Sequence, residues 1–175
     1  MWVKLLQLLY LRVPSLPILS LQELSIIDAT IDELQGALSS GRITAVELVA
    51  RHLHRIAQYD RRGPTLNSIP VINQNIFEDA QASDHSRASG NIRSSLEGLP
   101  YTVKDSYKVK GMTVAAGSHA FENLVATDDA FTVSRIRNGG GILLGLTNMP
   151  PMAAGGMQRG LYGRAESPYS AEYLT

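Results

Sequence analysis

The chain has 175 residues and contains no cysteine. This absence excludes a disulfide framework, a cysteine nucleophile and thiolate ligands for a metal. It does not fix the compartment, because a protein of either redox setting can lack cysteine. The 44% hydrophobic content is typical of a globular protein. The length corresponds to roughly one domain of about 150 residues.

An excess of charge of either sign is also missing. The 16 Lys and Arg residues balance the 16 Asp and Glu residues, which gives a formal net charge of +0. A protein that binds nucleic acid usually carries a basic surplus that neutralises phosphates. We therefore expect no nucleic-acid partner.

The chain lacks a hydrophobic run long enough for a bilayer, which needs about 20 apolar residues. Its apolar start is broken by Lys4 and Arg12, and two prolines follow at positions 14 and 17. We interpret residues 1–25 as an irregular N-terminal segment and expect no membrane span. The predicted location is the cytoplasm, with a secretory signal peptide as the alternative.

Two capping boxes mark the first helices. Thr30 is followed three residues later by Glu33, and Thr44 by Glu47, and apolar residues recur at helical spacing after each box. In such a box the hydroxyl and the carboxylate each accept an amide that the helix leaves unpaired. The pattern predicts a helical hairpin over residues 30–60.

After residue 60 the pattern alternates between strands and helices, which predicts an α/β fold. The expected elements are an extended segment at 66–72, a helix at 75–88 with Ile76, Phe77 and Ala80 inward, a polar surface loop at 83–95, a strand at 99–105, turns at 111–118, a helix at 128–138 and a buried strand at 142–146.

The sequence gives little support for a metal site or a phosphate site. His52 and His54 are two residues apart on a predicted helix and point in different directions, so they cannot share a metal ion. Glycines 139–141 follow a predicted helix and precede a strand. A phosphate loop needs the reverse order, with the helix after the glycines. We expect neither a metal nor a cofactor.

Lys104 and Asp105 stand at the end of the strand predicted over residues 99–105. Alternation places Leu99, Tyr101 and Val103 on one face and Lys104 on the other. One interpretation is an exposed lysine beside an aspartate. The other is a buried lysine that acts as a base, which requires its pKa to fall from about 10.4 towards about 7. Burial can supply such a shift.

The surroundings of Lys104 resemble a known family. The segment LEGLPYTVKDSYKVKGMTVAAGS at 96–118 resembles the opening motif of the amidase signature family, and residues 128–150 resemble its following Asp-Ala and Thr-Asn-Met motif. Weaker similarity covers 40–60 and 155–175. The resemblance extends over most of residues 28–175.

This resemblance implies a mixed β-sheet flanked by helices and the hydrolysis of a carbon–nitrogen amide bond. Family members use a triad of Ser, cis-Ser and Lys, in which a neutral lysine takes a proton from the middle serine and so activates the nucleophilic serine. Lys104 matches the catalytic lysine by position. The implied substrate is a small-molecule amide; no substrate-binding residue and no oligomeric state follow from the motifs.

The chain also departs from the family pattern. The two catalytic serines of the family lie in a Gly-Ser-Ser-x-Gly-Ser segment after a motif that matches residues 167–169, and no such segment occurs before Thr175. Ser118 lies at a different position, and the serine pairs at 39–40 and 94–95 precede Lys104. We expect residues 26–175 to be the N-terminal part of an amidase domain that is inactive alone.

Two alternatives remain at this point. The chain could be a non-catalytic interaction module that presents the helical hairpin at 30–60 to a partner. It could also be one half of a split amidase, completed by a second chain that carries the serines.

Overall fold

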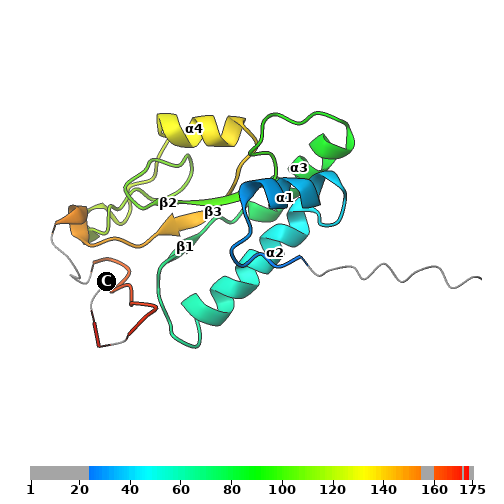
Figure 1. Cartoon of the computed structure of the whole chain (residues 1–175). Helices are drawn as coiled ribbons and strands as arrows, with labels where there is room; N and C mark the ends of the chain where they lie inside the picture. Colours follow the sequence, from blue (N-terminus) through cyan, green and yellow to red (C-terminus); the bar gives the residue numbers. More distant parts are fainter. Residues whose placement is uncertain (1–23, 155–159, 171, 174–175) are drawn as a thin grey trace, which may run out of the picture.

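The computed structural model describes residues 24–154, 160–170 and 172–173, so the predicted irregular segment lies almost wholly outside it. Within these residues, a small mixed sheet lies between two layers of helices (Figure 1). The protein is therefore α/β, as predicted. No helix in this part of the chain combines the length and apolar character that a membrane crossing requires.

The sheet has three strands in the order β1-β3-β2. They are β1 (Val71–Ile72), β2 (Pro100–Lys104) and β3 (Ile142–Thr147). The central strand β3 is antiparallel to β1 and parallel to β2. All of β3 except Thr147 is buried, because strands flank both of its edges and helices cover both faces. The strands predicted over 99–105 and 142–146 are confirmed, whereas the extended segment at 66–72 contributes only two strand residues.

The helical hairpin predicted over 30–60 is confirmed. It consists of α1 (Ile31–Ser39) and α2 (Ala45–Arg55), which continues into a short π-helical turn at 56–60. Both capping boxes form: the hydroxyl of Thr30 accepts the Glu33 amide at 3.2 Å, and the Glu33 carboxylate accepts the Thr30 amide at 2.7 Å. The second box, at the start of α2, has the same arrangement.

The next helix, α3 (Ile76–Ala88), has the predicted bounds but a different buried face. Ile76 and Ala80 are buried as predicted, whereas Phe77 is 45% exposed. The loop predicted from residue 83 is wrong for its first six residues, which complete α3. Ser83 is fully buried, and its hydroxyl tolerates burial because it donates a hydrogen bond to the buried Glu97 carboxylate at 2.7 Å.

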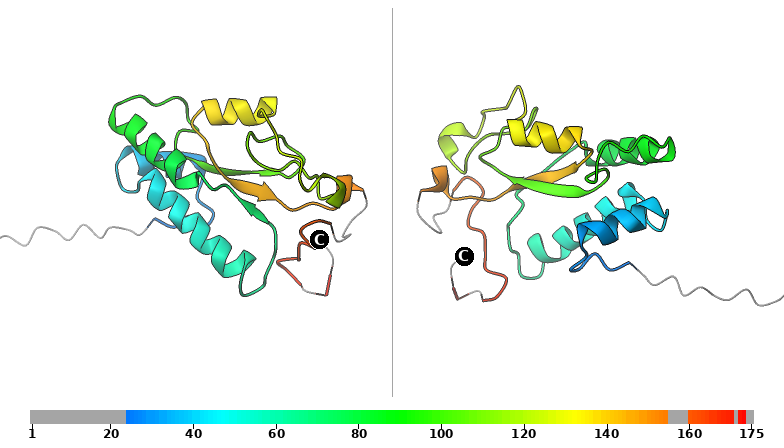
Figure 2. Two further views of the ribbon diagram at one scale, coloured as in Figure 1. Left: turned by 180° about the vertical axis from the view of Figure 1, so that it is seen from behind. Right: turned by 45° about the horizontal axis from the view of Figure 1, so that its top comes forward.

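Helices lie on both sides of the sheet, as the views in Figure 2 show. An apolar cluster packs between the sheet and the helices on each side. The larger cluster packs α1, α2 and α3 against Ile142 and Leu144. The smaller one lies under α4 (Phe131–Asn138) and includes Leu143 and Leu146. Leu99 was expected to share a face with Tyr101 and Val103, but it packs in the larger cluster, because it precedes the first residue of β2 and is not bound by the strand's alternation.

An ion pair between the exposed Arg93 and the buried Glu97 lies near the amino end of β2. The Glu97 carboxylate is fully buried and accepts hydrogen bonds from Arg93 Nε at 2.6 Å and Nη2 at 2.7 Å. Burial by itself would raise the pKa of Glu97, but the hydrogen bonds from Arg93 and Ser83 outweigh it and hold that pKa below its usual range. The ionised carboxylate therefore contributes to stability.

We expect Glu97→Ala to lower the free energy of unfolding by about 2–4 kcal/mol at pH 7, because Arg93 and Ser83 lose their acceptor inside the fold. The exposed helical residue Glu78 provides the control, and Glu78→Ala should stay within about 0.5 kcal/mol of the parent. Urea unfolding measures both changes. Equal losses in the two variants would contradict a stabilising pair.

The same pair predicts a pH dependence. Because the pKa of Glu97 is lowered in the folded state, its contribution is present above the unfolded value of about 4.3 and is lost as the pH falls through the lower folded value. Relative to Glu97→Gln, the parent should therefore lose its advantage in unfolding free energy only on the acid side of that window.

Candidate functional site

Lys104 is the last residue of β2, and its Cα partner is Thr147, the last residue of β3. Because the two strands are parallel, their carboxyl ends meet at one edge of the sheet, where open α/β sheets bind ligands. Tyr101 and Val103 pack against the apolar cluster under α4, whereas Thr102 and Lys104 are exposed. The described residues thus place Lys104 at this edge but do not remove its amine from water.

The next residue, Asp105, is fully buried and joins three segments. Its amide donates to the carbonyl of Thr147 at 3.1 Å, and its carbonyl accepts the amide of Ala116 at 3.2 Å. Its carboxylate oxygen Oδ2 accepts the amide of Gly117 at 2.8 Å. The residue after Lys104 is therefore tied both to β3 and to the turn at 115–118.

The Asp105 carboxyl has no cationic partner among the described residues. Burial raises its pKa, and the amide of Gly117 and the hydroxyl of Tyr162 offset this only in part. Tyr162 lies close enough to interact with the carboxyl, and its hydroxyl is 3.3 Å from Thr113 Oγ1. Asp105 Oδ1 has no hydrogen bond of good geometry in the described part of the chain.

The turn at 115–118 depends on a glycine. Gly117 has a φ of 68°, and a Cβ atom there would collide with the carbonyl of Met149 and the backbone of Pro150. Its carbonyl accepts the amide of Leu161 at 2.8 Å, and that of Ala116 accepts the amide of Met152 at 2.7 Å. The turn thereby brings two later segments to the edge that carries Lys104.

The side chain of Asn148, the residue after β3, also holds the end of that strand. Its buried side-chain amide donates to the carbonyl of Asn67 at 2.9 Å and to that of Gly163 at 3.1 Å. The side chain of Asn67 in turn donates to the carbonyls of Tyr162 and Arg164. Segments that are almost 100 residues apart in the sequence therefore form one polar frame around the strand ends.

The serines considered from the sequence have other roles. Ser118 Oγ accepts the amide of Ala120 at 3.2 Å and caps the short 3-10 turn at 119–121. Ser94 donates to the carbonyl of Gly139 at 2.6 Å. Ser39 accepts a hydrogen bond from Arg87. Within the described residues, no serine hydroxyl forms a hydrogen bond with Lys104.

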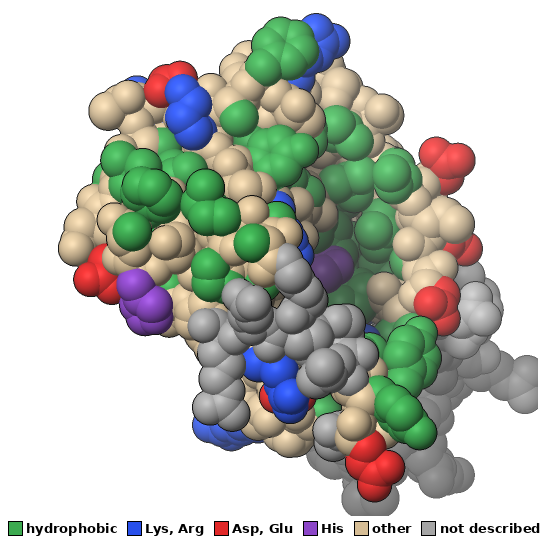
Figure 3. All heavy atoms as spheres, turned by 90° about the vertical axis from the view of Figure 1, so that its left-hand side faces the viewer, with side chains coloured by type: hydrophobic (Ala, Val, Ile, Leu, Met, Phe, Trp, Pro, Cys, Tyr) green, Lys and Arg blue, Asp and Glu red, His purple; other side chains and the backbone are tan. Residues whose placement is uncertain are grey.

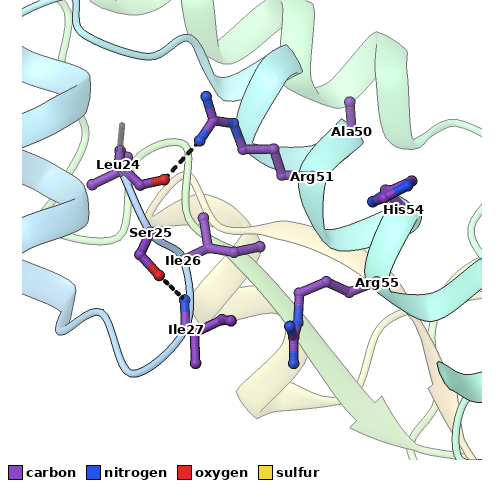
Figure 4. A pocket seen from close by; sticks show the side chains of 8 residues that line it. All are labelled: Leu24, Ser25, Ile26, Ile27, Ala50, Arg51, His54 and Arg55. Carbon is purple, nitrogen blue, oxygen red and sulfur yellow. Dashed lines mark hydrogen bonds between the residues drawn. The ribbon is translucent and has the colours of Figure 1, made fainter. Parts of the chain in front are cut away.

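Among the described residues, no group of three or more His, Asp or Glu side chains could hold a metal ion. A cavity of about 570 Å³ opens between α2 and the segment that precedes α1 (Figure 4). Arg51 spans it and donates to the carbonyl of Leu24 at 2.7 Å. None of its lining residues comes from β2 or β3, so this cavity is separate from the edge with Lys104. The lining residues are Leu24–Ile27, Ala50, Arg51, His54 and Arg55.

The family model described as Amidase matches residues 47–175, which include Lys104 and the whole frame around it. The chain belongs to the amidase family. This confirms the resemblance that the motifs around Lys104 carry.

Individual amidase-family relatives agree. A glutamyl-tRNA(Gln) amidotransferase subunit of Chromohalobacter salexigens is 36% identical over 143 residues, which cover 81% of this chain and 29% of the relative. The native peptide amidase from Stenotrophomonas maltophilia superimposes with a TM-score of 0.76 at 29% identity, covering 82% of this chain and 31% of that one. An amidase family protein from Bacillus anthracis gives 0.75 at 33% identity, with coverages of 83% and 30%.

These figures also give the extent of the match. The chain spans about three tenths of the length of the relatives it resembles. The shared fold includes the helical hairpin and the mixed sheet, as expected from the resemblance.

The sequence pattern pointed to Lys104 but not to its supporting residues. Asp105 stands next to Lys104 in the motif, yet nothing in the alternation indicates that its carboxyl is buried. Tyr162 and Asn148 lie in segments without apolar periodicity. The only local signal was the glycine-rich character of 111–118, which is typical of turns.

We expect Gly117→Ala to destabilise the fold more than Gly111→Ala. Both glycines have positive φ, but Gly111 has open space where a Cβ atom would lie. The conformational cost common to both is about 1–2 kcal/mol, and the overlap at Gly117 should add about 1–3 kcal/mol. Thermal or urea unfolding measures the difference. Equal losses of stability in the two variants would show that the close approach of Gly117 to Met149 does not add to the cost of the substitution.

Asp105 should make stability depend on pH in the opposite sense to Glu97. The pKa of Asp105 is raised in the folded state, so the protonated carboxyl contributes favourably to the free energy of unfolding. This contribution is fully present below the unfolded pKa of about 3.9 and is lost as the pH rises through the folded pKa. The stability of Asp105→Asn relative to the parent should therefore increase between about pH 3.5 and pH 7.

Asp128→Asn is the control for this prediction. Its carboxylate is exposed, and the hydrogen bond from Lys108 lowers its pKa, so the relative stability of this variant should change in the opposite direction with pH. Unfolding in urea at the two pH values separates the cases. A parallel trend in both variants would refute the assignment to Asp105.

Proposed function

We propose that this chain is the lysine-bearing part of an enzyme that hydrolyses the carbon–nitrogen bond of an amide, with Lys104 as the base. The observation that supports it most is the position of Lys104 at the common carboxyl edge of β2 and β3, inside the region that matches the amidase family. The substrate class that we propose is a small-molecule amide.

In the proposed reaction the neutral amine of Lys104 accepts a proton from the middle serine, which in turn accepts one from the nucleophilic serine. The nucleophilic oxygen attacks the amide carbon, and the proton passes to the departing amine as the carbon–nitrogen bond breaks. Water then hydrolyses the acyl-enzyme by the reverse proton path. Of these groups only the lysine matches a position in this chain.

The environment of Lys104 explains why further polypeptide is required. A lysine base must be neutral near pH 7, and removal from water is the usual way to favour that state. The described residues leave Lys104 exposed. Figure 3 looks onto the left-hand side of Figure 1, where hydrophobic side chains are spread over the surface.

Exposed apolar residues on the segments around the strand ends include Phe121, Leu124, Val125 and Met152. Such a surface suits contact with more protein. We propose that polypeptide carrying the two serines covers this edge, and that residues 1–175 alone are inactive. The domain boundary at 25–26 and the cytoplasmic location stay predictions.

The first test is an assay of the purified chain with an aryl amide that releases a coloured amine. We expect no hydrolysis above the buffer rate, because both the nucleophile and the amide donors that stabilise the oxyanion are missing. Robust hydrolysis by residues 1–175 that disappears in Lys104→Ala would overturn the prediction of inactivity.

The second test supplies the missing part. The chain is co-expressed with the remaining segment of an amidase-family relative, including its Gly-Ser-Ser-x-Gly-Ser motif, and the complex is assayed in the same way. Lys104→Ala should then lower kcat by about 10²–10⁴-fold, the usual contribution of a general base. Lys110→Ala, which changes an exposed lysine six residues further on, should leave kcat unchanged. An active complex that tolerates Lys104→Ala would exclude Lys104 as the base.

A further inference from the structure

We propose that Asp105 is a positioning residue for Lys104, and that its hydrogen bond with Gly117 sets the position of the Lys104 strand relative to the segment at 160–163. This inference rests on the proposed function of Lys104. It concerns residues that neither proton transfer nor nucleophilic attack uses.

The first argument is the electrostatic environment of Asp105. Buried carboxylates usually have a cation or several hydrogen-bond donors nearby. Asp105 is fully buried, has no ion-pair partner in the described part of the chain, and leaves Oδ1 without a hydrogen bond. The carboxyl therefore depends on backbone donors such as the Gly117 amide, and this bond holds the side chain to the turn at 115–118.

The second argument is the geometry of the strand end. Asp105 is held by its amide, its carbonyl and its carboxylate to β3, Ala116 and Gly117 respectively. The carbonyl of Lys104 itself accepts the amide of Tyr107 at 2.9 Å. These bonds fix the backbone on the carboxyl side of Lys104, so the long side chain starts from a defined point. Proton transfer depends strongly on such placement.

The third argument is what Tyr162 connects. Its hydroxyl is 3.3 Å from Thr113 Oγ1, and the amide of its neighbour Leu161 donates to the carbonyl of Gly117, whose own amide donates to the Asp105 carboxylate. The Asp105 carboxylate is therefore linked through Gly117 to the segment at 160–163, which joins the strand of the lysine to a segment almost 60 residues further along the sequence.

The test follows amide hydrogen exchange by NMR in the full 175-residue chain. In Asp105→Ala, exchange at the Gly117 amide should accelerate at least about tenfold, because this amide loses its carboxylate acceptor. Exchange at the Tyr107 amide, which donates to the Lys104 carbonyl, should accelerate with it, because the strand end is no longer held to the turn. Asp105→Asn should restore most of the protection, since its side-chain oxygen still accepts the Gly117 amide.

Asp60→Ala is the matched control. Asp60 is also buried and accepts the backbone amides of Ser68 and Ile69, so its carboxylate binds the segment at 68–69 and not the turn at 115–118. This variant should weaken the fold without a selective effect at Gly117 and Tyr107. Uniform acceleration in Asp105→Ala, equal to that in Asp60→Ala, would show a merely structural role and overturn the proposal.

The complemented enzyme supplies the functional readout. Asp105→Ala should lower kcat at least about tenfold with little change in KM, and Asp105→Asn should recover most of it. Unchanged kcat in Asp105→Ala would overturn the proposal. If Lys104→Ala is fully active, the proposed function fails instead, and the exchange data still decide whether Asp105 holds the strand end.

Discussion

The parallel pairing of β2 with β3 is the constraint on which the rest of this structure depends. It brings the last residues of the two strands, Lys104 and Thr147, to one edge of the sheet. Together with the pairing of β1, it makes β3 the only strand of the described sheet with a neighbour on both sides. Ile142 and Leu144 pack in the larger apolar cluster, whereas Leu143 and, beyond the register shift, Leu146 pack in the smaller one. The helical hairpin and α4 cover the two faces that this pairing creates.

Two buried carboxylates lie near opposite ends of β2, and their surroundings shift their pKa values in opposite directions. Glu97 precedes the strand, binds Arg93 and Ser83, and has a lowered pKa, so its ionised carboxylate stabilises the fold. Asp105 follows the strand, binds only neutral donors, and has a raised pKa. The destabilising carboxylate is the one beside the lysine. Strained or unfavourable groups of this kind concentrate at functional sites.

Family membership and local structure together define what this chain brings to the carboxyl edge of the sheet. It carries Lys104, the turn at 115–118 and the polar frame that fixes the strand ends. It spans about three tenths of the length of its relatives, and the described residues leave Lys104 exposed. The placement of the proposed base and its activation are thus separate matters: the described residues hold the backbone at Lys104, and we propose that further polypeptide covers the edge and activates the lysine.

The sequence by itself determined the local elements, and its family resemblance pointed to Lys104 as the proposed base. The capping boxes at Thr30 and Thr44 and the strand before Lys104 formed as expected, apart from Leu99, because they depend on residues that are neighbours in the sequence. Only the tertiary structure decided that Asp105 is buried without a cation, that Ser83 serves Glu97, and that segments almost 100 residues apart meet at one edge. Such contacts depend on how the elements pack together, and local periodicity carries no information about the partner of a polar side chain.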